Sequence, residues 1–296
     1  MFDPHQLIAL ASVLRRGSFD AAAAELHVTP SAISQRIKAL EERAGTALVQ
    51  RGSPCTGTPQ GLRLAKHAED ISLLEQALAR DLQTNQTPRA HLRVAVTADS
   101  LATWFIGAMA KLPEILFDLV VDDQDHSADW LKRGEVSAAV TASPTLPGCD
   151  AHALGSMRYL ATASPSYLAT WMPQGPTPET LAKAPCLTFN AKDMLQRQWI
   201  ETYFNTRVSP PSHFMPSTQS FLDAARAGLG WGMNPEQLAR RSLRRQRLTT
   251  LLEDAPLDVP LNWQVSRVLS PALKHVTTAV VQTARAQLIQ PREPNR

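Results

Sequence analysis

Residues 18–51 read SFDAAAAELHVTPSAISQRIKALEERAGTALVQR and predict two helices joined by a tight turn. Thr29 can cap the second helix, and Pro30 suits its first position because proline has no N–H group to leave unpaired there. The apolar residues of this helix recur at the 3.6-residue period and form one stripe, made of Ile33, Ile37 and Leu40. The pattern is typical of a helix-turn-helix unit, whose second helix enters the major groove of DNA.

The opposite face of the second helix is polar and mostly uncharged. It lies about 150° from the apolar stripe, at about 100° per residue. It consists of Ser31, Ser34, Gln35 and Lys38. Side chains that donate and accept hydrogen bonds suit base edges and phosphates in a major groove. We therefore predict that these four residues bind DNA, and the surface of an ordinary helical hairpin remains the alternative at this point.

The flanking segments extend this unit to residues 1–60. A preceding helix has an apolar face, formed by Leu7, Leu10, Ala11 and Leu14. After the second helix, residues 48–50 predict a short strand that ends at Arg51, and glycines and prolines between 52 and 59 indicate a turn and a return. These features predict a winged helix-turn-helix domain, with Arg51 on the wing placed for a phosphate or the minor groove.

Length and composition limit the class of protein. A chain of 296 residues can form two or three compact units. A hydrophobic content of 44% with 19% charged residues indicates a globular rather than a disordered protein. The net charge of +3 is compatible with DNA binding without demonstrating it, because a large second domain dilutes a local basic surface.

The three cysteines, Cys55, Cys149 and Cys186, are far apart and fit no metal-binding or disulfide pattern. We expect no metal ion and no cofactor. The chain starts with an amphipathic segment instead of a signal peptide, and it contains no apolar run long enough to span a membrane. These observations predict a cytoplasmic protein with reduced thiols and no membrane partner.

Residues 61–88 predict a linker between domains. A helix is expected from Gly61 to about Thr84. Its apolar residues recur every seven positions and form a seam of Leu64, Ala68, Ile71, Leu74 and Leu78. This short coiled-coil pattern favours pairing with a second chain, and packing on its own domain is the alternative. The polar residues 84–88 then predict a hinge.

From residue 92 onward the pattern alternates between strands and helices. Strands are expected at 92–96, 119–122, 137–142, 159–163, 186–190, 213–215, 231–234 and 263–268. Helices are expected at 101–111, 127–133, 166–171, 193–204, 218–227, 236–243 and 271–288. Repeated strand–helix units predict an α/β fold with mainly parallel sheets.

Two strand-to-helix junctions have the chemistry of an anion site. In TADSLATW, residues 97–104, Asp99 or Ser100 can cap the following helix, and its N–H groups up to Thr103 can hold a ligand carboxylate. Ser217 and Thr218 form a second such helix start. Most capped helices bind nothing, so a purely structural cap remains the alternative at each junction.

Acidic and aromatic side chains near the first junction indicate a cationic ligand. Asp122 and Asp123 end the second expected strand, where carboxylates can hold an ammonium or guanidinium group or form an ordinary turn. Trp104 can cover an aliphatic stem, although an aromatic residue at helical spacing is more often part of a core.

A basic run follows late in the chain. Its five arginines are Arg240, Arg241, Arg244, Arg245 and Arg247. Such a run is usually the solvated face of a helix. The alternative is that these arginines form a second contact with DNA. The sequence contains no phosphate-loop, serine-hydrolase or metalloprotease motif, so we do not expect an enzyme.

Residues 1–62 strongly resemble the DNA-binding domain of LysR-type transcriptional regulators, above all in the segment TPSAISQRIKALE at 29–41. The segments TADSLATW at 97–104 and WLKRGEVSAAV at 130–140 look like the ArgP/LysG (IciA-like) branch of that family, and the resemblance covers essentially the whole chain. It implies an effector-binding domain over 89–296 with two Rossmann-like α/β subdomains, similar to periplasmic binding proteins and joined by two crossover strands. We place the first at about 91–162 and 268–296 and the second at about 163–267, with the effector between them.

The resemblance also implies a function. It implies a transcription regulator that binds double-stranded DNA as a homotetramer, with RNA polymerase as a further partner and an amino-acid exporter gene as target. In this branch an acidic pair occupies the place of Asp122 and Asp123, which matches lysine or arginine as effector. Asn190 stands where related proteins often carry an acid. A small-molecule binding protein without DNA activity and a LysR-type regulator with another effector are the alternatives.

Overall fold

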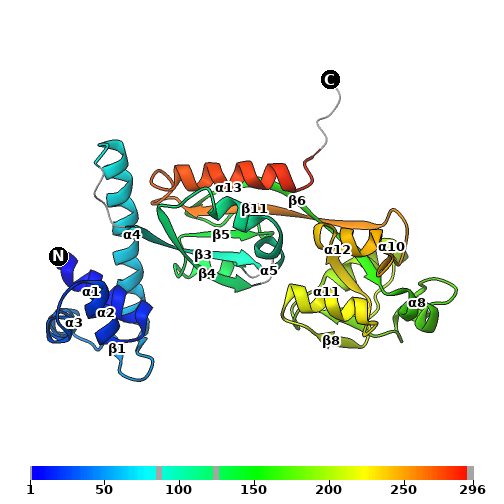
Figure 1. The fold of residues 1–296 in the computed structure, drawn as a ribbon, viewed down its shortest axis with the longest axis horizontal. Coiled ribbons are helices and arrows are strands. Elements are labelled where there is room, and N and C mark those ends of the chain that lie inside the picture. Colours follow the sequence, from blue (N-terminus) through cyan, green and yellow to red (C-terminus); the bar gives the residue numbers. More distant parts are fainter. Residues whose placement is uncertain (1, 85–88, 123–126, 292–296) are drawn as a thin grey trace.

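The computed structural model describes residues 2–84, 89–122 and 127–291 (Figure 1). A small helical unit lies at one end, a long helix leads from it to a first α/β unit, and a second α/β unit lies at the far end. The predicted fold class, a helix-turn-helix domain followed by an α/β domain of two parts, is confirmed.

Three helices form the N-terminal unit: α1 (Pro4–Arg16), α2 (Phe19–Glu25) and α3 (Pro30–Ala44). Thr29 caps α3 as predicted, because its Oγ1 accepts the N–H of Ala32 at 3.2 Å. The apolar stripe of α3 is fully buried in a core that it shares with α1 and α2. The opposite face of α3 is thereby directed to solvent.

The wing is a two-stranded antiparallel sheet of β1 (Val49–Gln50) and β2 (Thr56–Gly57). Glu41 of α3 holds its base, since Oε1 accepts the N–H of Leu48 at 2.8 Å. A Cβ atom at Gly61 would overlap the carbonyl oxygen of Leu48, so only glycine permits this close approach of the next helix to the wing. The wing is therefore fixed from both sides.

Helix α4 (Pro59–Asp81) is the linker, and it packs along α1. Leu64 and Ile71 of the predicted seam are partly buried against the helix-turn-helix core, so the own-chain alternative holds for this half of the helix. Leu74 and Leu78 remain exposed, the latter by 58%. The predicted seam is thus divided between packing within the chain and an open apolar face.

Three side-chain hydrogen bonds attach α4 to the first α/β unit, one of them from Ser137 Oγ to the carboxylate of Asp70 at 3.3 Å. Gln76 Nε2 donates to the carbonyl oxygen of Glu114 at 3.3 Å, and Arg80 Nη2 donates to that of Ala272 at 3.0 Å. These bonds fasten the helix that carries the DNA-binding unit to the first α/β unit.

One large mixed sheet runs through both α/β units, in the order β10-β6-β11-β5-β3-β4, with β9 paired to β6. Its strands are β3 (Ala90–Thr97), β4 (Ile115–Asp122), β5 (Ala138–Thr141), β6 (Cys149–Ala163), β9 (Gly232–Pro235), β10 (Thr249–Thr250) and β11 (Pro256–Ser266). β3 is parallel to β4 and β5, whereas β6 is antiparallel to β11 from Cys149 to Leu160. β6 and β11 are the two crossover strands, visible in Figure 1 between the units.

The prediction of mainly parallel sheets is wrong for this sheet because the sequence indicated only the ends of the two crossover strands. Gly155 interrupts the pattern of β6, and Pro256 and Pro260 interrupt that of β11, where prolines argue against a central strand. The small second sheet, β7 (Cys186–Thr188) with β8 (Ser212–Phe214), is parallel.

Helices cover these sheets. In the first unit they are α5 (Ala98–Ser100), a π-helical turn (Leu101–Phe105), α6 (Ile106–Met109), α7 (Ser127–Lys132) and α13 (Lys274–Gln287). In the second unit they are α8 (Pro165–Trp171), α9 (Pro178–Leu181), α10 (Leu195–Phe204), α11 (Thr218–Ala227) and α12 (Glu236–Arg244). In the part of the chain that the structure describes, no helix is long and apolar enough to cross a membrane.

Candidate DNA-reading face and interunit cleft

The four residues predicted to read DNA form one exposed surface on α3, which we call the reading face: Ser31, Ser34, Gln35 and Lys38. Lys38 lies 3.9 Å from Glu42, a distance at which an exposed ion pair contributes little. The exposed Arg51 follows β1, and its guanidinium group lies 5.6 Å from the ring centre of Phe19. The structure therefore brings all five predicted DNA-binding residues to solvent on one small unit.

A polar cluster behind the reading face joins α1 to α2. Glu25 accepts a hydrogen bond from Ser12 Oγ at 2.6 Å and forms ion pairs with Arg15 and Arg16, each at 3.2 Å. Burial alone would raise the pKa of Glu25, but these three partners lower it to about 2. The carboxylate therefore stays charged and stabilises the frame of the reading helix.

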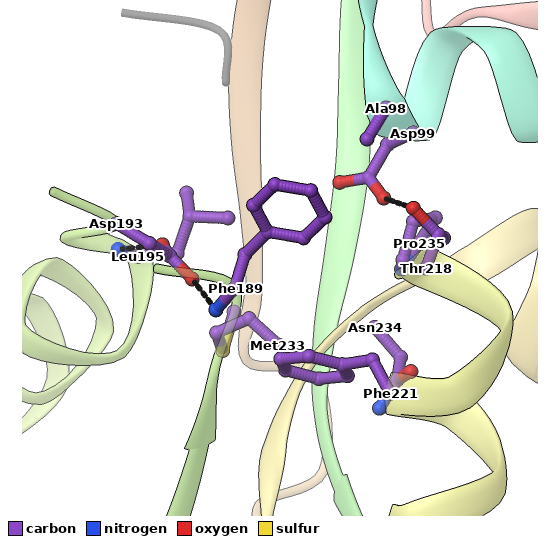
Figure 2. A pocket seen from close by; sticks show the side chains of 10 residues that line it. All are labelled: Ala98, Asp99, Phe189, Asp193, Leu195, Thr218, Phe221, Met233, Asn234 and Pro235. Carbon is purple, nitrogen blue, oxygen red and sulfur yellow. Dashed lines mark hydrogen bonds between the residues drawn. The ribbon is translucent and has the colours of Figure 1, made fainter. Parts of the chain in front are cut away.

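The second candidate site is a hollow between the two α/β units, which we call the interunit cleft (Figure 2). Its lining residues are Ala98, Asp99, Phe189, Asp193, Leu195, Thr218, Phe221, Met233, Asn234 and Pro235. The free space amounts to about 30 Å³, which is enough for about one water molecule. In this conformation the hollow is too small to enclose an amino acid.

Asp99 bridges the cleft. Its Oδ2 accepts a hydrogen bond from the Tyr159 hydroxyl of β6 at 2.7 Å, and its Oδ1 accepts one from Thr218 Oγ1 of α11 at 2.9 Å. Burial raises the pKa of Asp99, the two hydrogen bonds oppose this, and the nearby charge of Asp193 raises it further. One carboxylate thus links the first unit, a crossover strand and the second unit.

Asp193 stands on the opposite wall, as Figure 2 shows. Its carboxylate accepts the backbone N–H groups of Phe189 at 2.9 Å and Leu195 at 3.0 Å, and Nε2 of Gln196 at 3.3 Å. These bonds hold the carboxylate at the start of α10. Because two carboxylates share one cleft, each favours a cation between them.

The remaining walls of the cleft are mostly apolar, with contributions from Phe189, Leu195, Phe221, Met233 and Pro235. No lysine, arginine or histidine is found among the described residues that line it. A negative potential in an apolar enclosure suits a ligand with a cationic end and an aliphatic stem.

The first predicted junction is corrected in three respects. Neither Asp99 nor Ser100 caps the helix; Thr97 does, because its Oγ1 accepts the N–H of Ser100 at 3.1 Å and the helix starts at Ala98. The side chain of Ser100 is buried against Thr97, and Thr103 Oγ1 donates to the carbonyl oxygen of Asp99 at 2.6 Å. Neither side chain lines the cleft.

Trp104 is also placed elsewhere than predicted. It is 1% exposed and packs edge-on against Phe105 in the main core, so its packing role replaces the predicted ligand contact. The aromatic surface of the cleft comes from Phe189 and Phe221 instead.

Of the predicted acidic pair, only Asp122 lies within the described residues, and it does not line the cleft. Asp122 accepts the indole N–H of Trp130 at 3.0 Å and is absent from the described lining, and Asp123 lies outside the described residues. Asn190 accepts the N–H of Lys192 at 2.7 Å within its own loop. Its turn positions Asp193, an acid that the sequence analysis missed.

At the second junction, Ser217 caps α11 as predicted, since its Oγ accepts the N–H of Ser220 at 3.3 Å. Thr218 lines the cleft and donates to Asp99. The missed residues Phe189 and Asp193 had one signal in the sequence: Phe189 lies near the end of an expected strand and Asp193 starts the next expected helix, and α/β proteins place ligand contacts at such strand ends.

A DNA-reading unit joined by a long helix to a two-part α/β domain with a charged cleft defines a ligand-responsive transcription regulator. Residues 4–62 match the bacterial regulatory helix-turn-helix proteins of the lysR family, and residues 85–285 match the LysR substrate binding domain. The chain belongs to the LysR family of transcription regulators. This family binds DNA and small-molecule effectors and is not enzymatic.

The relatives agree with this assignment. The HTH-type transcriptional regulator LysG of Mycobacterium tuberculosis is 44% identical over 286 residues, which cover 95% of this chain and 94% of the relative. The crystal structure of ArgP from Mycobacterium tuberculosis has a TM-score of 0.77 at 42% identity and covers 98% of this chain and 100% of its own. Full-length LysG from Corynebacterium glutamicum with bound effector Arg has a TM-score of 0.65 at 35% identity, with the same coverage. The predicted resemblance to the ArgP/LysG branch is confirmed.

Proposed function

We propose that this regulator senses a basic amino acid, lysine or arginine, in the interunit cleft. The observation that carries the proposal is the pair Asp99 and Asp193, which face a cleft with mostly apolar walls from opposite units. A dicarboxylate would add negative charge between them, and a neutral ligand would leave their repulsion uncompensated. A dication with an aliphatic stem supplies both missing features.

The ligand's own carboxylate requires a separate donor. The first turn of α11 has N–H groups that helix hydrogen bonds do not use, and Thr218 at its start lines the cleft. A helix N-terminus favours a carboxylate through these N–H groups and the helix dipole. The proposed effector contacts are therefore Asp99 and Asp193 for the cationic groups and the start of α11 for the carboxylate.

Because the cleft is narrow, effector binding should change the separation of the two α/β units. An effector must break or share the hydrogen bond between Asp99 and Thr218, which now joins the two units. It therefore selects a different separation of the units, and α4 conveys the change to the DNA-binding unit through Gln76 and Arg80.

One relative bears on the ligand class. Arginine is the bound effector of the Corynebacterium glutamicum LysG structure, which supports the choice of ligand class. We also propose a homotetramer on double-stranded DNA, RNA polymerase as a partner and an amino-acid exporter gene as target. The open apolar face around Leu78 supports the pairing of two chains through α4.

Calorimetry on the full chain tests the ligand class. Wild-type protein should bind lysine or arginine and bind norleucine, which lacks the side-chain cation, poorly. Asp193→Asn should weaken arginine binding by about 2–5 kcal/mol, because a ligand charge loses its buried partner. The control is Asp122→Asn, which makes the same change at the half-buried acid outside the described lining and should bind arginine normally.

The result can also contradict the proposal. Tight binding of norleucine or of a dicarboxylate, with no response to lysine or arginine, would mean that this LysR-type regulator has another effector. Equal loss of arginine binding in Asp122→Asn and Asp193→Asn would move the acidic site to the end of β4. Thermal unfolding of both variants checks that each is folded.

A further inference from the structure

A second hollow lies on the far α/β unit, where α11 and α12 end next to each other. We call it the basic hollow. It is lined by Arg226, Arg241, Ser242, Arg245 and Arg247 and has a volume of about 230 Å³. The predicted basic run is therefore not a uniform solvated face, since three of its five arginines line one concave site.

The floor of the basic hollow is built by buried polar contacts. Ser242 is 2% exposed, and its Oγ accepts a hydrogen bond from Arg226 Nε at 2.8 Å. Arg226 Nη1 also lies 2.7 Å from Asp223, which balances its charge. Arg226 is thus held in place from α11 while its guanidinium group still lines the hollow.

The other three arginines carry charge that the described residues do not balance. No hydrogen bond or ion pair of the side chains of Arg241, Arg245 or Arg247 is found within residues 2–84, 89–122 and 127–291. In contrast, Arg240 on the same helix pairs with Glu236 at 3.5 Å. Like charges four residues apart on a helix repel, so the hollow gathers positive charge at a cost in stability.

The helix dipole explains only part of this arrangement. Arginines in the last turn of α12 are favoured by the negative helix end. Arg247, however, lies beyond the helix and is brought back by a turn at Gln246, whose φ of 55° is left-handed. The N–H of Arg247 then bonds to the carbonyl oxygen of Ser242 at 2.9 Å, which places this residue beside the same hollow.

We propose that the basic hollow binds the phosphate oxygens of a small soluble polyphosphate, such as the diphosphate group of a nucleotide. Guanidinium groups present paired donors that match phosphate oxygens, and three unbalanced charges match a multiply charged anion. The volume is below that of pockets that enclose a whole ligand, about 300–1,000 Å³. The hollow therefore holds the charged part of the molecule and leaves the rest in solvent.

The position of the hollow argues for a soluble anion over the phosphates of the operator DNA. α11 and α12 lie in the unit at the far end of the molecule from α3 (Figure 1). The site is also separate from the interunit cleft, because the two sets of lining residues share no member. A bound polyphosphate would thus act on the regulator independently of the amino-acid effector.

Calorimetry with inorganic diphosphate and with ATP as probes tests the proposal on the full chain. Wild-type protein should bind diphosphate, and Arg241→Gln/Arg245→Gln should bind it at least about tenfold more weakly, because charge-assisted hydrogen bonds are lost. The matched control is Arg240→Gln/Arg244→Gln, which removes two charges at the same spacing from the adjacent positions, outside the hollow. It should change the affinity by less than about twofold, since exposed charges are largely screened.

Three outcomes would overturn the proposal. The first is that wild-type protein does not bind diphosphate. The second is that the two double variants weaken diphosphate binding equally. The third is that wild-type protein does not bind diphosphate and Arg241→Gln/Arg245→Gln lowers the salt dependence of operator binding. The last result would assign the hollow to DNA phosphates. Arginine binding should be unchanged in both double variants, so failure here is distinguishable from failure of the proposed effector.

Discussion

The reading face and the interunit cleft differ in how their functional side chains are held. On α3, no side-chain hydrogen bond is found for Ser31, Ser34 or Gln35 among the described residues, and all three are exposed. In the cleft, Asp99 and Asp193 already accept hydrogen bonds from the protein. The reading face therefore presents unused donors and acceptors to solvent, whereas the two carboxylates of the cleft are already hydrogen-bonded within the protein.

This difference suits the two regions to different tasks, the reading face to DNA recognition and the cleft to the response to a ligand. A rigid frame with exposed side chains can dock on DNA without rearrangement. A closed cleft cannot accept a ligand without moving its walls, so ligand binding there is coupled to conformation. A regulator needs both properties, and this chain places them in different units connected by α4.

The largest effect is expected where the two regions are joined. Leu78→Asp places a charge on the open apolar face of α4 and should prevent pairing of two chains. Light scattering should show a smaller mass, and operator affinity should fall about 100-fold or more because two linked DNA-binding units bind as one. His67→Asp, an exposed position of α4 outside the seam, is the control. Unchanged mass and affinity in Leu78→Asp would show that this face does not pair chains.

The stability of the helices that support the reading face should depend on pH because of Glu25. Its pKa of about 2 in the folded protein lies below the ordinary value of 4.5, so its stabilising effect is complete above 4.5 and is lost as the pH falls toward 2. Glu25→Gln should lower the free energy of unfolding at neutral pH by about 2 kcal/mol, after allowance for partial exposure. Acid unfolding followed by circular dichroism should show a flatter profile than in wild type or in Glu42→Gln. Identical profiles would refute the role of the cluster.

Within the reading face, substitutions at base contacts and at phosphate contacts should have different effects on DNA binding. Gln35→Ala should reduce the preference for operator over random DNA by about 1–3 kcal/mol, because base contacts carry the sequence information. Lys38→Ala and Arg51→Ala should weaken binding to both DNAs and reduce the salt dependence if they contact phosphates. Gel-shift titrations at two salt concentrations measure both effects. Unchanged operator affinity in all three variants would eliminate the proposed reading face.

The smallest effect is expected from protonation of Asp99 in the cleft, which should change the affinity for arginine. Because burial raises the pKa of Asp99 above 3.8, protonation of this carboxyl begins at a higher pH than for an ordinary aspartate. Arginine affinity should therefore decrease as the pH is lowered below neutral, and the decrease should begin at a higher pH than an ordinary aspartate would give. Calorimetry over this range should show the decrease in wild type and a smaller one in Asp99→Asn. A pH-independent affinity would exclude Asp99 as a charged contact.

The same comparison explains what the sequence could predict. The reading face lies on one short helix, so the spacing of Ile33, Ile37 and Leu40 determines which residues are exposed. The cleft combines residues that are far apart in the chain, such as Asp99, Asp193 and Thr218, and local patterns contain no information on which of them meet. Periodicity therefore identified Thr218 as part of a helix start but could not pair it with Asp99.

The seam of α4 and the basic run show the same limit. Seven-residue spacing predicted an apolar stripe correctly but not that Leu64 and Ile71 would be used within the chain. Likewise, the run Arg240–Arg247 reads as a helix face, and only the turn at Gln246 and the approach of Arg226 from α11 make it concave.

The most direct test of the account is footprinting of the operator with and without arginine, on wild type and on Asp193→Asn. If the cleft governs response and the reading face governs recognition, arginine should change the wild-type footprint. Asp193→Asn should give the arginine-free footprint at wild-type affinity and should not respond at concentrations that saturate wild type. An Asp193→Asn variant that still responds to arginine, or that is folded but no longer binds the operator, would contradict the separation of the two functions.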